Sequence, residues 1–559
     1  MSAPTSSSAP SAVRAAASLV VVRDAPGGLE VLLLRRAERG DHNSGAWVFP
    51  GGVVDAIDAQ SAGCCAGLDD AQASERLDLP EDGLAYYVAA VRECFEEAGL
   101  LYACDSGGEL VSPSRSIAEH VAGWRRPLHR GERTLAQLCA EMGWRIALDR
   151  LAYLSHWLTP LGMAKRFDTR FFLAESPQGQ DSMHDDAEMV EQRWLKPGDA
   201  LARSATLRLM TPTHATLRAL AAFDSVAAAL EWARSQRDVP LILPRVGTGS
   251  QGRRPVVPAE PAYAEIGRID PEGAGHASYN IQPEVPVRLS ARVIRVTANN
   301  GSVMTGPGTN TYLVGGGPHN EWAAIDPGPH DDAHLEAVLA AAPGPIRWIF
   351  ATHTHRDHSL GAVALKERTG AALHGLVADH PEWQDTSFVP DRILSGAERF
   401  AIDDGTTLRA IHTPGHASNH LCYLLEEEKT LFTGDHVMQL STVVINPPDG
   451  DMAAYLASLR GLLAEDLDWL APGHGFLMAE PKRAIEAIIA HRLKREAKVV
   501  DALRELGECD LDPLVARVYD DVPQRMHPVA LRSLKAHLLK LRDEGRAVER
   551  AGAWHLLEA

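Results

Sequence analysis

The sequence has few aromatic residues, few cysteines and no long apolar run. Aromatic residues make up 6% of 559 residues, and among the seven cysteines only Cys64 and Cys65 are adjacent. The cysteines show no spaced pairing pattern, so we expect reduced thiols and a cytoplasmic location. Since no apolar stretch is long enough to cross a bilayer, we expect no membrane-spanning segment.

Positive charge is also scarce. Asp and Glu number 74 against 55 Lys and Arg, which gives a formal net charge of -19. This balance argues against sequence-independent binding of nucleic acid by bulk electrostatics, although a local basic groove stays open. The length predicts several domains, because one hydrophobic core does not grow to this size.

Composition divides the chain into five parts. Residues 1–15 are rich in Ser, Ala and Pro and predict a disordered tail. Residues 237–286 are rich in Pro, Gly and charge and predict a linker. Between and after them we expect three domains, over residues 16–236, 287–487 and 488–559.

The most informative stretch is Thr352–His358, which follows the apolar run 346–351. We interpret the run as a buried strand. The stretch holds three imidazoles and a carboxylate, a set that a core cannot bury without partners. His353 and His355 point the same way from an extended segment, and a helix is expected to begin near Ser359. Asp357 and His358 therefore supply a second ligand direction, which suits two adjacent metal ions.

Further ligands must come from elsewhere in the chain. Three motifs offer them, each after an apolar run and a turn: His412–His416, Thr433–His436 and Ala471–Gly475. In this order the set resembles the metallo-β-lactamase superfamily and implies its αββα sandwich. The resemblance implies that one ion is held by His353, His355 and His416, the other by Asp357, His358 and His474, with Asp435 as the bridge.

Imidazole with carboxylate suits two Zn²⁺ ions, with iron or manganese as alternatives. A water held between the ions would ionise near neutral pH and attack the substrate, and we assign Asp357 a catalytic role there. Asp326 is implied as a supporting residue and not a ligand. His436 is expected to lie behind the ligands, and His412 and His420 to be ordinary polar residues.

Residues 305–314 are similar to the opening of the lactamase-β-like endoribonuclease branch. In that branch a winged helix follows the sandwich, and here helices over 492–506, 513–519 and 528–544 precede a wing over 547–557. The resemblance implies hydrolysis of phosphodiesters in RNA. Since fold does not fix substrate, acyl thioester hydrolysis of the glyoxalase II kind is the alternative. A nucleic-acid backbone could be met by Lys535, Lys540, Arg542, Arg546 and Arg550, but neighbouring acids make a packing module an equal reading.

The first domain carries a second acidic motif. Strands are expected over 17–22 and 29–34, then a helix over 89–98 that ends at Gly99. Glu93, Glu96 and Glu97 share one face of that helix. Like charges at this spacing repel, so either water or a cation such as Mg²⁺ or Mn²⁺ compensates them.

With Phe49–Gly52 upstream, Arg92–Gly99 resembles the Nudix box, and the α/β Nudix fold is implied. The long insertion before Arg92 and the strand 166–173 look like the coenzyme A diphosphatase branch. The resemblance implies that Glu93, Glu96 and Glu97 hold the metal, that Arg92 and Glu96 are catalytic, and that Asp58 stands where the family has a glutamate. Diphosphate hydrolysis of a nucleotide or coenzyme A type molecule is expected, with a nucleotide-sensing module as the alternative. Assembly into a homo-oligomer stays open.

Overall fold

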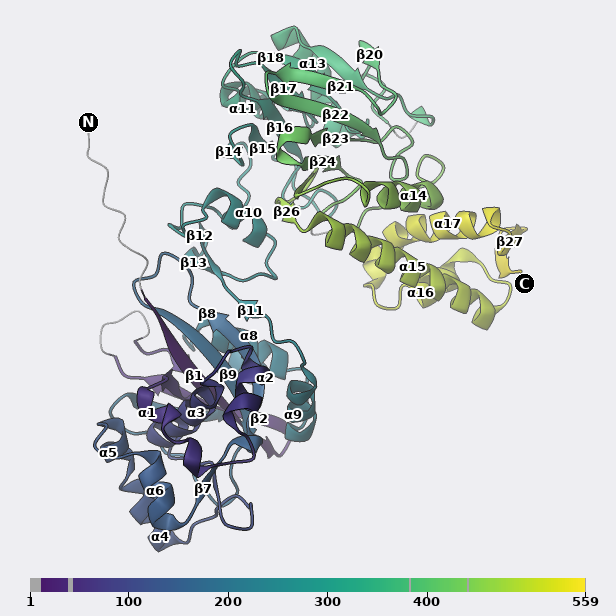
Figure 1. Cartoon of the computed structure of the whole chain (residues 1–559). Helices are drawn as coiled ribbons and strands as arrows, with labels where there is room; N and C mark the ends of the chain where they lie inside the picture. The colour runs from purple at the N-terminus through teal and green to yellow at the C-terminus, as the bar shows by residue number, and fades with distance from the viewer. Residues whose placement is uncertain (1–11, 39–43, 382–383, 440–441, 558–559) are drawn as a thin grey trace, which may run out of the picture. The chain divides into compact units, whose positions relative to one another are not determined.

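The computed structural model describes residues 12–38, 44–381, 384–439 and 442–557. The chain forms two compact units, which meet between Arg245 and Val246 in the sequence and are described separately (Figure 1). None of the helices among the described residues combines the length and the apolar character needed to span a bilayer.

The N-terminal unit is built on a sheet with the strand order β10-β2-β1-β9-β8-β11. β1 (Val13–Ala25) and β2 (Gly28–Arg36) form the expected antiparallel hairpin, and β1 pairs in parallel with β9 (Arg166–Glu175). The expected tail is therefore too long: β1 begins at Val13, and residues 1–11 lie outside the described residues. The remaining strands are β3 (Trp47–Val48), β4 (Gly51–Val53), β8 (Ala152–Leu158), β10 (Met189–Leu195) and β11 (Leu241–Ile242).

Helix α3 (Gly83–Ala98) packs on this sheet and carries the acidic motif. Val91 and Phe95 are buried against Leu19 and Phe172 of the strands. The helix ends at Gly99, whose φ of 74° is left-handed, as predicted. The other helices of this unit are α1 (Ala56–Ala59), α2 (Asp70–Leu77), α4 (Arg115–Ala122), α5 (Arg125–His129), α6 (Leu135–Met142), α7 (Pro197–Ala202), α8 (Thr211–Leu220) and α9 (Val226–Ser235).

A small second sheet joins the insertion to the rest of the unit. β7 (Arg145–Ala147) lies between β5 (Cys65–Ala66) and β6 (Ala103–Cys104). A single 3₁₀ turn, Ala62–Cys64, leads into β5.

The segment expected to be a linker is largely folded. A hairpin of β12 (Arg245–Gly249) and β13 (Gly252–Val256) precedes α10 (Tyr263–Ile269). Glu265 of α10 forms a buried ion pair, 2.6 Å long, with Arg295 of the C-terminal unit. The apolar residues scattered among its prolines and glycines, Val256 and Ile266 among them, pack with Phe476. These side chains make residues 246–286 part of the C-terminal unit, whereas β11, at the start of the expected linker, belongs to the N-terminal sheet.

Two sheets face each other in the C-terminal unit. The first is β14 (Val287–Arg288), β15 (Val293–Thr297), β16 (Asn310–Gly315), β17 (Trp322–Ile325), β18 (Ile346–Phe350), β19 (Ala372–Gly375) and β20 (Arg392–Ile393) in that order. The second is β21 (Arg399–Asp403), β22 (Thr406–His412), β23 (Leu421–Leu425), β24 (Thr430–Gly434), β25 (Trp469–Pro472) and β26 (Met478–Ala479).

Aromatic side chains fill the space between the sheets. Phe350 of the first sheet contacts Phe400 and Tyr423 of the second, with ring centroids 4.9 and 5.1 Å apart. On the outer faces, α11 (Asp332–Ala341) and α13 (Gly361–Thr369) pack on the first sheet, and α14 (Met452–Leu462) and the start of α15 pack on the second. This is the predicted αββα sandwich.

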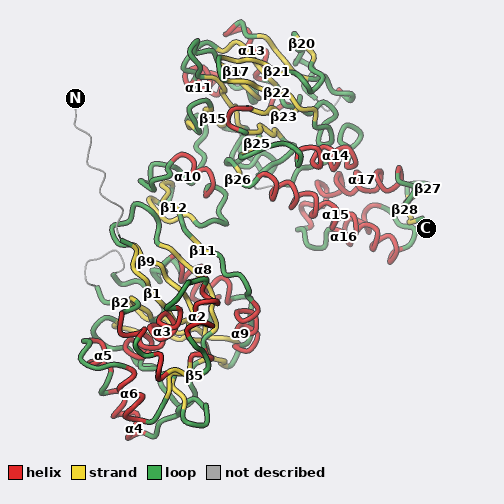
Figure 2. Tube along the Cα trace, viewed as in Figure 1, coloured by secondary structure: helices red, strands yellow, loops and turns green. Residues whose placement is uncertain are grey.

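Helix α15 (Pro481–Leu506) runs without interruption from the sandwich into the C-terminal module, as Figure 2 shows. Ile485 packs against the sandwich, whereas Val499 and Leu503 belong to the core of the module. The expected boundary between residues 487 and 488 therefore falls inside a helix. α16 (Leu511–Val518), α17 (His527–Asp543) and the hairpin of β27 (Ala547–Arg550) and β28 (Ala553–Leu556) complete the predicted winged helix.

Candidate dinuclear metal centre

The ligand loop lies between β18 and the short helix α12 (Arg356–Ser359). The helix begins three residues earlier than expected, because His355 already occupies the N-cap position. Asp357 and His358 consequently lie in the first helical turn, and His353 and His355 in the extended segment before it. One loop thus presents side chains in two directions, as the sequence predicted.

The first group of donor atoms consists of three imidazole nitrogens. His355 Nδ1 lies 2.9 Å from His353 Nε2 and 3.1 Å from His416 Nε2. Ligands in a tetrahedral zinc site with bonds of about 2.1 Å are separated by roughly 3.4 Å. The three histidines therefore stand almost as ligands of one ion would.

The second group combines two imidazoles and a carboxylate. Asp357 Oδ2 lies 3.4 Å from His358 Nε2 and 3.5 Å from His474 Nε2. Asp435 reaches both groups: its Oδ1 is 3.3 Å from His358 Nε2 and 3.2 Å from His474 Nε2, and its Oδ2 is 3.7 Å from His416 Nε2. A carboxylate with one oxygen on each side is placed as a bridge.

The donors fit a pair of metal ions. Among the described residues, His358 Nε2 and Asp435 Oδ1 are buried without a hydrogen-bond partner. Leaving such atoms unpaired costs about 1–3 kcal/mol each, more for a charged group. Five imidazoles and two carboxylates aimed at one space form the donor set of a divalent transition metal.

Hydrogen bonds behind the donors fix the orientation of four of the five rings. Four histidines direct Nε2 to the centre and use Nδ1 elsewhere. His358 Nδ1 lies 2.8 Å from Asp326 Oδ2, His416 Nδ1 lies 2.7 Å from the Val444 carbonyl, His353 Nδ1 lies 3.0 Å from Thr352 Oγ1, and His474 Nδ1 lies 3.1 Å from the Gly308 carbonyl. Such contacts select the tautomer whose free nitrogen binds a metal.

The electrostatics separate the two groups. Burial and neighbouring histidines lower the pKa of His353 and bring the pKa of His355 to about 3. Burial also lowers the pKa of His358, but Asp357, Asp435 and Asp326 outweigh it and raise that pKa overall. His353 and His355 are thus neutral and ready to coordinate, whereas His358 holds a proton that a metal ion would displace.

Three histidines were expected to play supporting or ordinary roles: His412, His420 and His436. They lie outside the donor groups formed by the described residues. His420 and His436 are buried, with ring centroids 5.5 Å apart, and His420 stacks on His353 at 5.1 Å. His412 is exposed, and its Nε2 lies 3.1 Å from the Ser418 carbonyl. Their expected supporting or ordinary roles stay predictions.

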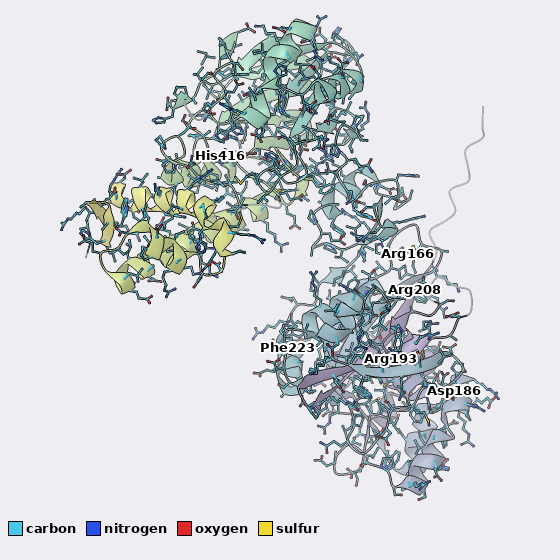
Figure 3. The ribbon with its side chains drawn as sticks, turned by 180° about the vertical axis from the view of Figure 1, so that it is seen from behind. Arg166, Asp186, Arg193, Arg208, Phe223 and His416 are labelled. Atoms are coloured by element: carbon cyan, nitrogen blue, oxygen red, sulfur yellow. The ribbon has the colours of Figure 1, made fainter. Side chains whose placement is uncertain are left out.

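A cavity of about 690 Å³ opens onto the donor atoms. His355, Asp357, His416, Asp435 and His474 line one end of it. The far wall comes from α15, α17 and the segment between α16 and α17, and includes Arg495, Asp521, Met526 and Val529. Figure 3 labels His416 at this junction of sandwich and winged helix. The sequence did not reveal this wall, because its residues belong to no motif and lie far from the ligands along the chain.

Three of the five basic residues that the sequence indicated in the winged helix are ion-paired, whereas Lys535 and Arg550 form no ion pair with the described residues. Lys540 and Arg546 both bind Glu496, at 2.8 and 3.0 Å, and Arg542 contacts Asp543 at 2.9 Å. These ion pairs favour the interpretation that the winged helix is a packing module and not a nucleic-acid-binding surface.

The second candidate site lies in the N-terminal unit, around Arg92. Its Nε and Nη2 donate to Asp58 Oδ1 and Oδ2, at 2.8 and 3.0 Å. Asp58 thus occupies the position expected from the sequence, although it is one methylene shorter than glutamate. Nη1 of Arg92 also donates to Glu93 at 2.9 Å and to Glu96 at 3.3 Å.

The three glutamates of α3 are held apart. Glu97 Oε2 accepts the Gly51 N–H at 2.9 Å, and burial raises the pKa of Glu97 well above its ordinary value. Glu93 packs on Gly52, where a Cβ added to the glycine would lie 2.3 Å from Glu93 Oε1. Burial raises the pKa of Glu93 to about 7. Among the described residues, these carboxylates do not form a group of three donors within 4.8 Å of one another. The structure therefore brings Glu93 and Glu96 to Arg92, and the expected role of the three glutamates as metal ligands stays a prediction.

Family models match the chain in three places. The model of the metallo-beta-lactamase superfamily matches residues 304–474, that of the NUDT19 Nudix domain residues 65–213, and that of the beta-lactamase associated winged helix domain residues 511–554. The order of domains is the predicted one.

Known proteins resemble either unit. The Beta-lactamase-like protein 2 homolog of Drosophila melanogaster is 33% identical over 46% of this chain and 90% of its own length. An atrochrysone carboxyl ACP thioesterase of Aspergillus chevalieri is 32% identical over 45% of this chain and 82% of its own length. The crystal structure of a NUDIX hydrolase from Alicyclobacillus acidocaldarius is 29% identical, with a TM-score of 0.34, over 39% of this chain and 96% of that one.

Proposed function

This chain belongs to the metallo-β-lactamase superfamily, and we propose that its C-terminal unit hydrolyses acyl thioesters or esters with an apolar acyl part. The cavity in front of the donor atoms carries the proposal. Its size suits a small organic molecule, and its lining as a whole is mainly apolar, although Arg495, Asp521 and Arg532 also contribute to it. The thioesterase named among the relatives agrees with this class.

The lining separates the cavity into two chemical ends. Val443, Met526 and Val529 offer apolar contacts, whereas the donor end is polar. An acyl chain on the apolar wall gains about 0.8 kcal/mol for each buried CH₂. The carbonyl carbon then lies at the donor end, where attack by water takes place.

The residues of the centre divide the work. His353, His355 and His416 would hold one ion, Asp357, His358 and His474 the other, and Asp435 would bridge them, with zinc as the proposed metal. Two such ions supply a water of lowered pKa and neutralise negative charge that develops on the carbonyl oxygen. The Asp357 side chain is 30% exposed and lines the cavity, which supports the proposal that it orients the attacking water.

Hydrolysis of RNA ranks second. The sequence favoured it, because the chain resembles an endoribonuclease branch. An RNA strand requires an open basic track. Here Arg495 in the cavity wall is ion-paired with Asp521 at 2.7 Å, and Lys540 and Arg542 of α17 are paired as well. Arg532, which also lines the cavity, forms no ion pair with the described residues. These pairings favour the acyl substrate.

For the N-terminal unit we propose metal-dependent hydrolysis of a diphosphate in a nucleotide or coenzyme A type molecule. The bidentate contact between Arg92 and Asp58, within the region that matches the Nudix model, supports it. Mg²⁺ or Mn²⁺ would be held by Glu93, Glu96 and Glu97, and it must displace Arg92 from the first two. If displacement fails, binding without turnover follows, which is the sensing alternative.

A single panel of substrates tests both proposals. Wild type, Asp357→Ala and Glu97→Gln are assayed, with their metal content, on acyl-coenzyme A of several chain lengths, single-stranded RNA, free coenzyme A and ADP-ribose. We expect acyl hydrolysis to fall at least about hundredfold in Asp357→Ala only, and diphosphate hydrolysis to fall in Glu97→Gln only. RNA cleavage without acyl hydrolysis, lost in Asp357→Ala, would replace the thioesterase proposal with a ribonuclease.

A further inference from the structure

Arg492 is a buried cation that lines the cavity, and neither proposed reaction uses it. The residue lies in α15 and is 3% exposed. Its Nη2 donates to the Val443 carbonyl, and its Cζ lies 5.5 Å from the centroid of the Tyr455 ring. Its Nε is buried without a hydrogen-bond partner, and no carboxylate among the described residues forms an ion pair with it. No acid of the described chain therefore compensates this guanidinium.

Burial of Arg492 without a counter-ion is costly, because a buried charge loses its hydration and here gains no ion pair in return. A neutral carbonyl and an aromatic ring replace only part of that hydration. An anion that enters the cavity would supply the missing charge. Arg492 therefore indicates a binding site for a negatively charged group.

Two residues of α17, Arg532 and Ser533, line the same cavity. Arg532 is exposed and forms no ion pair with the described residues. Ser533 is 6% exposed, and within the described part of the chain its hydroxyl has no hydrogen-bond partner. Both residues follow Val529 by three and four positions, so they share with it the face of α17 that borders the cavity. The wall that holds Arg492 thus offers a second cation and a hydroxyl.

The acidic residues of the cavity lining leave these two cations unpaired. Asp357 and Asp435 belong to the donor end. Asp521 accepts two hydrogen bonds from Arg495, at 2.7 and 3.0 Å, which neutralises both charges. Asp449 is buried and accepts hydrogen bonds from two neutral side chains, at 2.7 and 2.5 Å. At the winged-helix end of the cavity, positive charge therefore exceeds negative charge among the described residues.

We propose that Arg492, Arg532 and Ser533 bind a phosphate group in the thiol half of the substrate, remote from the bond that is hydrolysed. A phosphate monoester carries about 1.5–2 negative charges near neutral pH and three acceptor oxygens. The guanidinium fork of arginine matches two of these oxygens, and a hydroxyl donates to the third. A carboxylate has one charge and two oxygens, so it would use these donors less fully.

The apolar contacts of the cavity assign the phosphate to the thiol half. The acyl part is proposed to lie against Val443, Met526 and Val529, and a charge on that part would oppose its burial there. The thiol half therefore carries the phosphate. This assignment rests on the proposed acyl hydrolysis, whereas the anion site itself does not. Because the phosphate is remote from the reacting bond, it contributes to KM and not to kcat.

Direct binding to the full-length protein tests the anion site without catalysis. Isothermal titration compares pantetheine 4′-phosphate with pantetheine, which differ only in the phosphate, and hexanedioate with hexanoate, which differ in one carboxylate. None of the four contains a thioester or a diphosphate, so neither proposed site turns them over. Wild type should bind pantetheine 4′-phosphate at least about tenfold more tightly than pantetheine, because hydrogen bonds to a charged group favour binding by that factor or more.

Three variants locate the site. Arg532→Gln, at an exposed position, should reduce the preference for the phosphate to within about twofold. Arg492→Gln should do the same, and thermal unfolding without ligand establishes that this variant is folded. Lys494→Gln is the matched control. Lys494 is an exposed residue of α15 that lies outside the cavity lining and forms no ion pair with the described residues, so its removal should keep the preference.

The outcomes separate the anion site from the proposed function. Equal affinity of wild type for pantetheine 4′-phosphate and pantetheine, or a preference that Arg532→Gln keeps, would overturn the site. A preference for hexanedioate alone, lost in Arg532→Gln, would overturn the assignment to phosphate and to the thiol half.

Kinetics then test the role of the site in hydrolysis. Arg532→Gln should raise the KM for an acyl thioester of pantetheine 4′-phosphate about tenfold at unchanged kcat, and leave the same thioester of pantetheine unaffected. Phosphate binding by wild type without hydrolysis of either thioester would keep the anion site and overturn its assignment to a thioester substrate.

Discussion

Asp326 fixes His358: its Oδ2 lies 2.8 Å from His358 Nδ1, and both side chains are almost fully buried. The same carboxylate accepts the Thr352 N–H and hydroxyl, at 2.7 and 2.8 Å. One residue at the end of β17 thus orients a proposed ligand and the start of the ligand loop together.

Asp326→Asn should weaken metal binding without removing a donor. The amide cannot accept at both of its terminal atoms, so the hydrogen bond that sets the His358 tautomer is weakened. We expect affinity for Zn²⁺ to fall about 10–100-fold, measured by competition with a chromophoric chelator. Asp404→Asn, at a carboxylate that is 80% exposed on the same unit, is the matched control. Equal affinities in the two variants would contradict the role of Asp326.

The ion pair between Arg92 and Asp58 gives a testable prediction for the N-terminal site. The side chains of Arg92 and Asp58 are 9% and 1% exposed. Asp58→Ala leaves a buried guanidinium with only part of its partners, which should cost about 3 kcal/mol of unfolding free energy. Chemical denaturation measures it.

Asp55→Asn is the control for this change, because Asp55 lies 3.7 Å from the same guanidinium but is 61% exposed. Its effect should stay within about 0.5 kcal/mol. Comparable losses of unfolding free energy in both variants would mean that the buried contact of Asp58 with Arg92 adds no stability of its own.

The ligand motifs were predictable because each is short and follows a buried strand. His353 through His358 came from one loop, and the apolar run before them identified β18 as the strand that presents it. The order of His416, Asp435 and His474 in the sequence then sufficed to complete both donor groups, which the structure brings together.

What the sequence did not reveal depends on contacts between distant residues. Glu265 and Arg295 pair over 30 positions, and that pairing helps to fold a segment whose prolines and glycines indicated a linker. Likewise α15 shows one helical pattern across two domains, so composition alone could not show that its second half, with Arg495, would face the donor atoms. In the N-terminal unit, the spacing of the glutamates on α3 predicted that they share one face of the helix. The sequence did not show that Arg92 donates hydrogen bonds to two of them, Glu93 and Glu96.

The wall of the cavity yields a prediction about chain length. Val529 lines the cavity but lies outside the core of the winged helix. Val529→Trp should fill the apolar end, so KM for long acyl chains should rise at least about tenfold while short acyl substrates keep their kcat/KM. Steady-state kinetics on a series of acyl-coenzyme A esters measures this.

Val389→Trp, at a position that is 70% exposed and outside the cavity, is the matched control. It should leave the whole series unchanged. If Val529→Trp affected short and long chains alike, the acyl part would not lie on this wall.

Glu496 should make the stability of the winged helix depend on pH. Burial raises its pKa, but hydrogen bonds with His537, Lys540 and Arg546 outweigh burial and hold the pKa at about 2. An unfolded chain has this group near about 4.3. A depressed pKa in the folded state contributes stability that is present above the unfolded value and is lost as pH falls toward about 2.

The Glu496→Gln variant isolates that contribution. At about pH 6 the wild type should unfold at a higher temperature than Glu496→Gln, and the difference should shrink as the pH falls from about 4.5 to 2.5. Glu549→Gln, an exposed glutamate of the wing, is the control and should follow the wild type throughout. Because other carboxylates titrate in the same range, only the difference between wild type and variant reports on Glu496. A difference that stayed constant with pH would mean that the variant acts through lost packing and not through the charge.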